Sequence, residues 1–245
     1  PFGYSLGVGG FHTCAIDEVG LDCWGSDADG QTSIPTRLVN PEGLSVGAAH
    51  SCVIDGSQLR CWGNNDYGQT NVPAGLSNPR QVSAGGVATC VVDDNGVHCW
   101  GSGGLDSGTT DVPSGLVNPR QVVVGVTHAC ALDDRGVVCW GSDDQDQATI
   151  PVNLLNPRQL ALGNEHTCAL DDNGVRCWGA SDKGQTAVPA SLRNPRQLVA
   201  SANATCTLDE QGWQCWGETS ESVFGETVFD IADFPRNLVA PRGLS

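Results

Sequence analysis

Short apolar segments recur along the chain at nearly constant spacing, and each is bounded by glycine, proline, asparagine or aspartate. The fifth repeat of this pattern predicts three short strands, at Gln159–Leu162, His166–Leu170 and Val175–Trp178. A fourth, outer strand is expected at Thr186–Val188. Pro189 would end it, because a proline at a sheet edge costs no ladder hydrogen bond. No run of about 18 apolar residues occurs, so the sequence predicts no membrane span.

Cysteine and tryptophan mark the period of this pattern. The twelve cysteines form six pairs whose members are nine residues apart, and a Trp-Gly dipeptide follows every second cysteine. The first cysteines of successive pairs are 38, 38, 40, 38 and 38 residues apart. A period near 40 residues indicates a repeat architecture, so residues 1–245 are expected to form a single domain. The pairs are Cys14 and Cys23, Cys52 and Cys61, Cys90 and Cys99, Cys130 and Cys139, Cys168 and Cys177, and Cys206 and Cys215.

The hairpin between the second and third strands indicates how the cysteines pair. In the fifth repeat, a loop at Asp171–Gly174 places Cys168 opposite Cys177, and in the second repeat a Gly56-Ser57 turn preserves the same alignment. Directly opposed residues of an antiparallel pair lie within disulfide range. We therefore predict one cross-strand disulfide in each repeat, with buried free thiols as the alternative. Metal binding is disfavoured because no Cys-x-x-Cys spacing occurs. Oxidised pairs imply an extracellular or periplasmic setting.

Four-stranded units of about 40 residues, repeated around a ring, are the blades of a β-propeller. The sequence thus predicts an all-β fold, a six-bladed β-propeller of four-stranded repeats with one intrablade disulfide per blade. An open solenoid is the alternative, but it needs polar end caps, and neither end of the sequence offers one. The ends look complementary instead, because Pro241–Ser245 copies Pro41–Ser45. Since Leu6–Gly9 also copies Leu44–Gly47, we expect chain from both ends to close the ring.

The composition narrows the choice of partners and compartment. The net charge is −16, and an acidic surface repels phosphate backbones, which disfavours nucleic-acid binding. Eleven of the twelve basic residues are arginine, and Lys183 is the single lysine. The sequence contains no methionine, and we interpret it as a mature product whose leader has been removed.

Several motifs resemble the regulator-of-chromosome-condensation repeat: His12–Ile16, His166–Leu170 and the recurring Cys-Trp-Gly. The Gly-Gln-Thr-x-Val-Pro segments at Gly68–Pro73 and Gly184–Pro189 look like the bacterial secreted branch of that family, which includes propellers similar to the secreted β-lactamase inhibitors. The resemblance covers essentially the whole chain and implies a propeller, but no single function. Well-known members have seven blades, whereas this sequence has six repeats. Nuclear members act on small GTPases and chromatin, a role that suits a disulfide-rich acidic chain poorly.

Few residues suggest chemistry. His12, His50, His128 and His166 all stand two residues before a first cysteine, which would suit a metal ring, but packing between blades is the expected role. Carboxylates spaced by one residue, as in Asp27–Gly30, suit Ca²⁺. No EF-hand loop follows them, so solvated turns and no cofactor are expected. No nucleophile elbow, phosphate-binding glycine loop or zinc-protease motif occurs, which predicts a protein that is not an enzyme.

The directions of the strands sort the loops onto two faces. The starts of the first strands and the hairpin tips between second and third strands share one face, called here the tip face. It carries arginines in one repeated position and paired acids at the tips, which should largely neutralise each other. These arginines are Arg80, Arg120, Arg158, Arg196 and Arg242, and the tip acids include Asp93, Asp94, Asp133, Asp134, Asp171 and Asp172.

The opposite face, called here the loop face, carries the turns between first and second strands and the loops that follow the third strands. These loops vary in length: repeat three gains two residues, and repeat six gains eight between Trp216 and Pro235. Variable loops on a rigid scaffold often carry recognition, and exposed aromatic residues there would be anchors. The alternative is that the insertion of repeat six only seals the ring. The candidate partner-binding residues are Asp29, Asp66, Tyr67, Asp106, Asp144, Lys183, Phe224 and Phe229.

These observations predict a secreted, non-enzymatic propeller that binds a protein or a glycan. One alternative is a self-associating structural subunit of an extracellular filament or surface assembly. Another is an inhibitor of an extracellular hydrolase. Asn203-Ala204-Thr205 is a glycosylation sequon at the start of a predicted strand.

Overall fold

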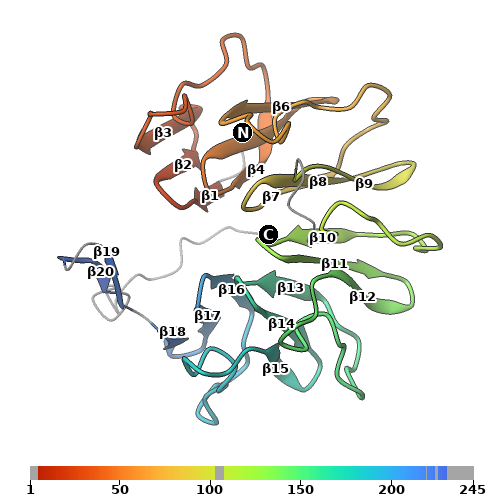
Figure 1. The fold of residues 1–245 in the computed structure, drawn as a ribbon, viewed down its shortest axis with the longest axis vertical. Coiled ribbons are helices and arrows are strands. Elements are labelled where there is room, and N and C mark those ends of the chain that lie inside the picture. The colour runs from red at the N-terminus through yellow and green to blue at the C-terminus, as the bar shows by residue number, and fades with distance from the viewer. Residues whose placement is uncertain (1–4, 103–107, 219, 224–225, 231–245) are drawn as a thin grey trace.

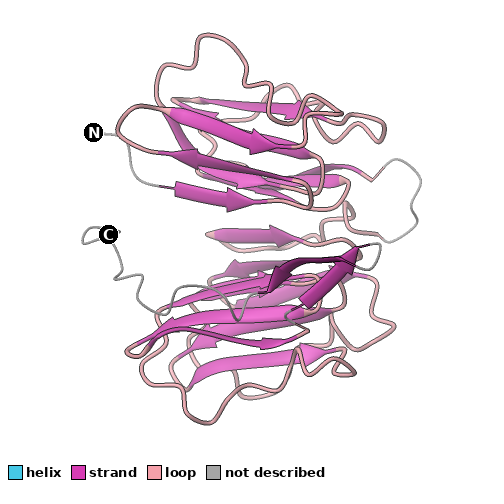
Figure 2. Cartoon of the chain, turned by 90° about the vertical axis from the view of Figure 1, so that its left-hand side faces the viewer, coloured by secondary structure: helices cyan, strands magenta, loops and turns pink. Residues whose placement is uncertain are grey.

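The structure, a computed structural model, describes residues 5–102, 108–218, 220–223 and 226–230. Within these residues the chain forms strands and turns but no helix, and hence no helix able to cross a membrane. Six antiparallel sheets of three strands follow one another in chain order (Figure 1), and seen from the side they lie one above another (Figure 2). Each sheet is one repeat and is called a blade, numbered one to six along the chain.

The strands have equivalent positions in all six blades. The first strands are β1 (Ser5–Val8), β4 (Pro41–Val46), β7 (Gln81–Ala84), β10 (Gln121–Val124), β13 (Gln159–Leu162) and β16 (Gln197–Ser201). The middle strands are β2 (His12–Ile16), β5 (His50–Asp55), β8 (Ala88–Asp93), β11 (His128–Asp133), β14 (His166–Asp171) and β17 (Ala204–Asp209). The third strands are β3 (Leu21–Gly25), β6 (Gln58–Gly63), β9 (Gly96–Gly101), β12 (Gly136–Gly141), β15 (Gly174–Gly179) and β18 (Gly212–Gly217).

The predicted cysteine register is confirmed in every blade. In blade five Cys168 pairs with Cys177 across β14 and β15, and the two form a disulfide. All six predicted disulfides form, and no free cysteine remains. The loop in blade five is tighter than predicted, because Asp171 pairs with Gly174 and leaves only two residues in the turn. The strands around the disulfide are therefore longer at the tip than the apolar pattern indicates.

The predicted fourth strand is wrong. Thr186–Val188 makes turns instead of a strand, and every blade sheet has three strands. The N–H of Ala187 donates to the carbonyl of Gly184 (3.0 Å). The N–H of Val188 donates to the carbonyl of Thr186 (3.0 Å). These local bonds use the backbone donors that a ladder to the third strand would need.

The insertion of repeat six forms an additional element that the sequence did not predict. It is an antiparallel hairpin of β19 (Ser220–Val223) and β20 (Glu226–Asp230), which follows β18 and lies apart from the blades (Figure 1).

The core lies between consecutive blades. Between blades two and three, Ile54 and Leu59 pack against Val82 and Val91, and Leu76 of the connecting segment packs beside them. All residues of β5, β8, β11 and β14 are buried, because each of these strands is covered on both faces. Full burial of one such apolar side chain stabilises the fold by about 1.5–3 kcal/mol.

The first strands of successive blades lie against one another from β1 through β4, β7, β10 and β13 to β16. Among the described residues, β16 makes no comparable contact with β1. The segment Pro241–Ser245, which we expect to help close the ring, lies outside the described residues.

Candidate functional site

A buried glutamine organises each regular loop of the loop face. In blade two, the side-chain oxygen of Gln69 accepts the N–H of Tyr67 (3.0 Å), and Gln69 itself is only 1% exposed. Tyr67 is thereby held at the loop surface, where 38% of the residue is exposed. The same bond occurs in blades one, four and five, where Gln31 binds Asp29 (2.8 Å), Gln147 binds Gln145 (2.8 Å) and Gln185 binds Lys183 (2.9 Å).

The backbone carbonyl of this glutamine fastens the loop to the next blade. The carbonyl of Gln69 accepts the indole N–H of Trp100 (3.0 Å) and the hydroxyl of Thr89 (2.8 Å) from blade three. The Trp in the Cys-Trp-Gly motif is therefore a clamp between blades. Equivalent indole bonds join Trp62 to Gln31 (2.9 Å), Trp140 to Thr109 (2.9 Å), Trp178 to Gln147 (3.0 Å) and Trp216 to Gln185 (2.9 Å).

A histidine extends this contact. Because the Thr89 hydroxyl donates to Gln69, its oxygen is free to accept from Nε2 of His50, 2.9 Å away. Burial lowers the pKa of His50 to about 4, so the imidazole is neutral at physiological pH. The expected packing role of the histidines is confirmed. The other members are His12 with Ser51 (2.7 Å), His128 with Thr167 (2.7 Å) and His166 with Thr205 (2.8 Å).

Both partners of the hydrogen bond between histidine and hydroxyl are absent at the junction of blades three and four. Blade three has Ala88 at the position that is histidine in blades one, two, four and five, and blade four has Ala129 where its neighbours have a hydroxyl residue. Both alanines are buried and belong to the same apolar cluster. A buried hydroxyl without a partner is costly, so replacing both polar groups preserves the junction.

The acidic side chains of the loops make turns. Both oxygens of Asp27 accept loop hydrogen bonds, from the Thr32 amide (2.8 Å) and the Ser33 hydroxyl (2.8 Å). Bonds from Ser33 and Thr32 lower the pKa of Asp27. Asp143 binds Ala148 and Thr149 in the same way. Among the described residues no three His, Cys, Asp or Glu side chains gather as metal ligands would.

The structure brings two of the candidate partner-binding residues together. The side-chain amide of Asn64 donates to Asp29 (3.0 Å) and to Asp66 (3.0 Å), which joins the loops of blades one and two. Lys183 makes a similar contact with Glu218 of blade six (3.5 Å). Within the part of the chain that the structure describes, Asp144 accepts a side-chain hydrogen bond only from Ser142 of its own loop (3.1 Å).

The remaining candidates stay predictions. Asp106 and Phe224 lie outside the described residues, as does the side chain of Phe229. The sequence reasoning missed Asn64 and the buried glutamines. The Gly-Gln-Thr motif is visible in the sequence. Nothing in the sequence indicates that the side-chain carbonyl and the backbone carbonyl of the same glutamine both accept hydrogen bonds.

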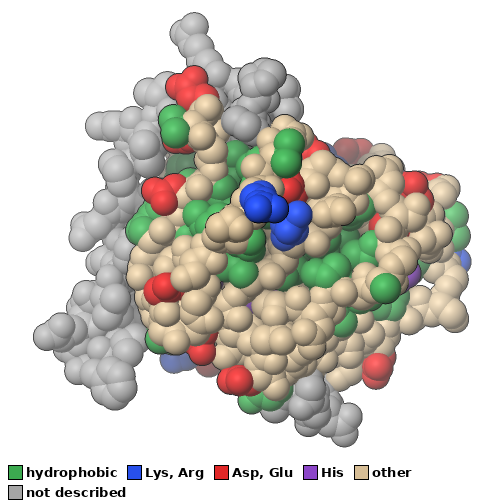
Figure 3. All heavy atoms as spheres, turned by 90° about the horizontal axis from the view of Figure 1, so that it is seen from above, with side chains coloured by type: hydrophobic (Ala, Val, Ile, Leu, Met, Phe, Trp, Pro, Cys, Tyr) green, Lys and Arg blue, Asp and Glu red, His purple; other side chains and the backbone are tan. Residues whose placement is uncertain are grey.

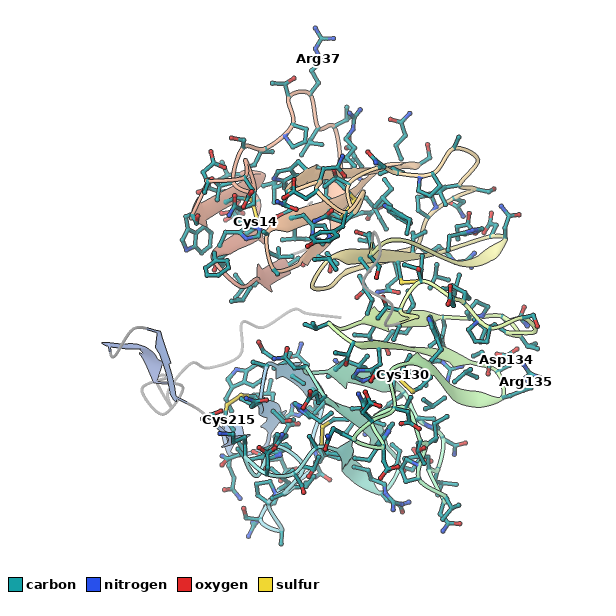
Figure 4. The ribbon with its side chains drawn as sticks, in the orientation of Figure 1. Cys14, Arg37, Cys130, Asp134, Arg135 and Cys215 are labelled. Carbon is teal, nitrogen blue, oxygen red and sulfur yellow. A yellow bond between two sulfur atoms is a disulfide. The ribbon has the colours of Figure 1, made fainter. Side chains whose placement is uncertain are left out.

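Charge is divided unequally between the two faces. On the tip face the arginines contact the hairpin tips as expected: Arg120 donates to the carbonyl of Asp133 (2.7 Å), and Arg80 pairs with Asp94. Asp134 and Arg135 project together from the tip of blade four (Figure 4). Every described arginine belongs to a hairpin, a first-strand start or a connecting segment on the tip side. They are Arg37, Arg60, Arg80, Arg120, Arg135, Arg158, Arg176, Arg193 and Arg196.

Among the described residues, the loop face has one cation, Lys183, and ten acidic side chains. In the view from above, acidic side chains are scattered over the surface, and basic side chains gather near the middle of the view and appear again at its edges (Figure 3). The described acids of the loop face are Asp27, Asp29, Asp66, Asp111, Asp143, Asp144, Asp146, Glu165, Asp182 and Glu218.

The comparisons with known proteins agree with this repeat. The family model described as "Regulator of chromosome condensation (RCC1) repeat" matches residues 158–185. This stretch runs from Arg158 on the tip face to Gln185 on the loop face. No curated protein matches the chain.

Several solved structures are similar to the chain. The ectodomain of the receptor kinase CR4 from Physcomitrella patens is 26% identical, with a TM-score of 0.74 over 89% of this chain and 65% of that one. This chain thus spans 65% of the length of that ectodomain. Prp20p from Saccharomyces cerevisiae is 17% identical, with a TM-score of 0.76 over 92% and 74% of the two chains. The ectodomain of ACR4 from Arabidopsis thaliana is 24% identical, with a TM-score of 0.69 over 88% and 81%.

The last two likenesses establish only the fold. Together with the repeat match, the six disulfide-linked blades and the tryptophan clamps, they identify the architecture. The chain is a β-propeller, and its fifth repeat matches the RCC1 repeat.

Proposed function

We propose that this propeller is an extracellular, non-enzymatic module that binds another protein with its loop face. The observation that carries the proposal is the position held by each buried glutamine. In four blades the buried glutamine accepts a backbone N–H at the equivalent loop position. The residues at this position are Asp29, Tyr67, Gln145 and Lys183. One constant bond thus displays a different side chain in each blade, which is the property expected of a recognition surface.

The charge of the loop face indicates the chemistry of the partner. The loop face carries ten described acidic side chains and one described cation, Lys183, whereas Arg80, Arg120 and Arg158 of the tip face donate to carbonyls of the hairpin tips. A protein with a basic surface would be steered to such a face and would bind most tightly at low salt. Tyr67 would supply an amphipathic contact at the centre of two acidic loops.

The extracellular setting rests on chemistry. Six disulfides persist in an oxidising compartment and not in a reducing cytosol. Two of the similar structures are receptor ectodomains, and Prp20p is a propeller that binds Gsp1p and histones. These proteins share a fold used for binding, whereas the partner of this chain follows from its own loop face.

The test is capture of partners from the native extracellular medium with immobilised forms of the chain. The wild type should retain a basic protein. Tyr67→Ala and Lys183→Glu should each change the amount of this protein that is retained, because both substitutions change the loop face. Arg193→Ala, on the tip face, is the matched control and should behave as the wild type. Raising the ionic strength from about 0.1 M to about 1 M shortens the Debye length from about 10 Å to about 3 Å and should release the partner. Identical capture by all forms would refute the proposal.

The alternative functions give different results. Inhibition of an extracellular hydrolase would be one form of protein binding by the loop face. It would appear as loss of that enzyme's activity. Glycan binding would survive removal of all proteins from the medium. Assembly into a filament would appear as a mass that rises with concentration in light scattering.

A further inference from the structure

The turns between first and middle strands belong to the loop face, and in blades one to four they carry exposed apolar side chains. Phe11 in blade one is 67% exposed, and Val126 in blade four is 48% exposed. The turns of blades two and three contribute Ala48, Ala49 and Val87, which are half-buried. These five residues are called here the apolar patch. Contiguous exposed apolar surface commonly marks an interaction site, whereas single apolar residues do not.

The apolar character is specific to these four blades. The residue directly before the middle strand lies at or near the surface in every blade, and in blade five it is the exposed Glu165. Blade five also has Asn164 in this turn, and blade six has Asn203. The repeat thus requires a surface residue here but not an apolar one, so the patch is a feature of blades one to four alone.

Backbone contacts join the four turns into one surface. The N–H of Ala48 donates to the carbonyl of Gly85 in blade three (3.0 Å), and the N–H of Gly86 donates to the carbonyl of Gly125 in blade four (3.2 Å). A side chain at Gly10 would place its Cβ 3.4 Å from the Cα of Ala48, so the turns of blades one and two are also in contact. Members of the apolar patch are these residues or their direct neighbours in the sequence. The patch is therefore continuous from blade one to blade four.

Acidic loops border the apolar patch. In blade one the N–H of Ser26 donates to the carbonyl of Phe11 (2.8 Å), and in blade two the N–H of Asn64 donates to the carbonyl of Ala49 (2.9 Å). Each loop that follows a third strand thus begins directly beside the patch. Among the described residues, these loops in blades one to four carry seven acids and no cation. The acids are Asp27, Asp29, Asp66, Asp111, Asp143, Asp144 and Asp146.

We propose that the apolar patch binds an aromatic or aliphatic side chain from a basic segment of the partner protein. The lysine and arginine side chains of that segment would lie over the acidic loops of blades one to four. This inference rests on the proposed function and adds the place and the chemistry of the central contact. An apolar centre within a polar rim is the usual anatomy of a protein interface, and a few central side chains carry most of the affinity.

The charge of the rim selects this occupant over a second copy of the chain. A second copy would bring the same acidic loops and a net charge of −16 against the patch, and the two copies would repel each other. A basic segment instead gains electrostatic attraction from the loops and buries its apolar side chain on the patch.

Calorimetric titration of the full chain with two synthetic peptides tests the inference. One peptide is rich in lysine and has a central tryptophan, and the other has serine in place of the tryptophan. The wild type should bind the tryptophan peptide about tenfold more tightly, because only this peptide buries an apolar side chain on the patch. Phe11→Ser and Val126→Ser should each reduce this ratio to about threefold or less.

The matched control is Val152→Ser. Val152 is 79% exposed in the connecting segment between blades four and five and is not part of the apolar patch. This variant should keep the tenfold preference that Val126→Ser loses. Because Phe11, Val126 and Val152 are all exposed, the three variants should unfold at the same denaturant concentration as the wild type.

The outcomes separate this inference from the proposed function. Equal affinities of the wild type for the two peptides would overturn the inference alone, since the serine peptide still reports binding to the acidic loops. Failure of both peptides to bind would overturn the inference and the proposed function together. A preference for tryptophan that persists in both Phe11→Ser and Val126→Ser would also overturn the inference. So would a mass that doubles with concentration in the wild type but not in Phe11→Ser, since the occupant would then be a second copy.

Discussion

The middle strand of a blade has a buried titratable side chain at each end, and the two ends are stabilised in opposite ways. His128 begins β11 at the loop face and Asp133 ends it at the tip face, and both are fully buried. Burial lowers the pKa of His128 to about 4, which keeps it neutral. Burial would raise the pKa of Asp133, but hydrogen bonds from the Val117 and Arg135 amides outweigh it and lower the pKa.

The two ends also differ in how far the repeats agree. The tip has an aspartate in blades two to six: Asp55, Asp93, Asp133, Asp171 and Asp209. At the loop end, histidine gives way to alanine in blades three and six. Replacing the aspartate would leave the amides of the connecting segment without their acceptor. The neutral pair of histidine and hydroxyl, in contrast, can be removed together. The tip end therefore preserves the repeat, and the loop end is free to vary.

The largest expected effect is acid destabilisation from the histidine end. The folded pKa of His50, His128 and His166 is about 4, below the ordinary value of 6.5, so the unfolded chain binds more protons between these values. The unfolding free energy should be fully present above about pH 6.5 and fall as the pH drops toward 4. One such histidine contributes about 3 kcal/mol. Denaturant titrations at about pH 7 and pH 4.5 measure the fall.

The variant His50→Gln provides the comparison. Glutamine keeps a donor for Thr89 but does not titrate, so its curve should be flatter over this range. Because the pKa of Asp93 and Asp133 is lowered, their stabilising contribution is lost only below about pH 4. Equal stability of the wild type at pH 7 and pH 4.5 would contradict the role given to the histidines.

The next effect concerns the tip end. Asp171→Ala removes the acceptor of Leu155 (2.9 Å) and Asn173 (2.7 Å) and leaves both amides without it. We expect a loss of about 2–4 kcal/mol in unfolding free energy, because a buried network is broken. Thermal or denaturant unfolding measures it. Its neighbour Asp172 is exposed, so Asp172→Ala should cost about 0.5 kcal/mol or less. Comparable losses in the two variants would show that burial of Asp171 is unimportant.

A smaller effect tests whether the loop-end pair behaves as a unit. Ala88→His places a ring nitrogen beside Ala129, which offers no partner, and should destabilise by about 1–3 kcal/mol. Adding Ala129→Thr restores the arrangement of His50 with Thr89 and should recover about 1 kcal/mol or more. The double-mutant cycle of unfolding free energies gives the coupling. A coupling near zero would mean that the two alanines coincide by chance.

The sequence was most informative where the repeats agree. The spacing of Cys168 and Cys177 was sufficient to predict the disulfide and the register of the hairpin, because period-two alternation leaves one alignment that keeps both on the same face. The expected fourth strand at Thr186–Val188 failed because its turns are held by backbone bonds that propensity does not reveal. The glutamine contacts were also hidden, since Gln185 reads as a polar loop residue although it is 1% exposed.

The smallest expected effect lies on the loop face itself. Lys183 and Glu218 approach to 3.5 Å, but both side chains are well exposed, so their ion pair should contribute only about 0.2–0.5 kcal/mol. Lys183→Ala should unfold within about 0.5 kcal/mol of the wild type in denaturant. The Lys183 amide still binds Gln185 in this variant, so the loop keeps its shape. A larger loss would mean that Lys183 holds blades five and six together. A side chain that is available for recognition should be replaceable with little loss of unfolding free energy. This expectation separates Lys183 from Asp171, whose replacement should destabilise the fold.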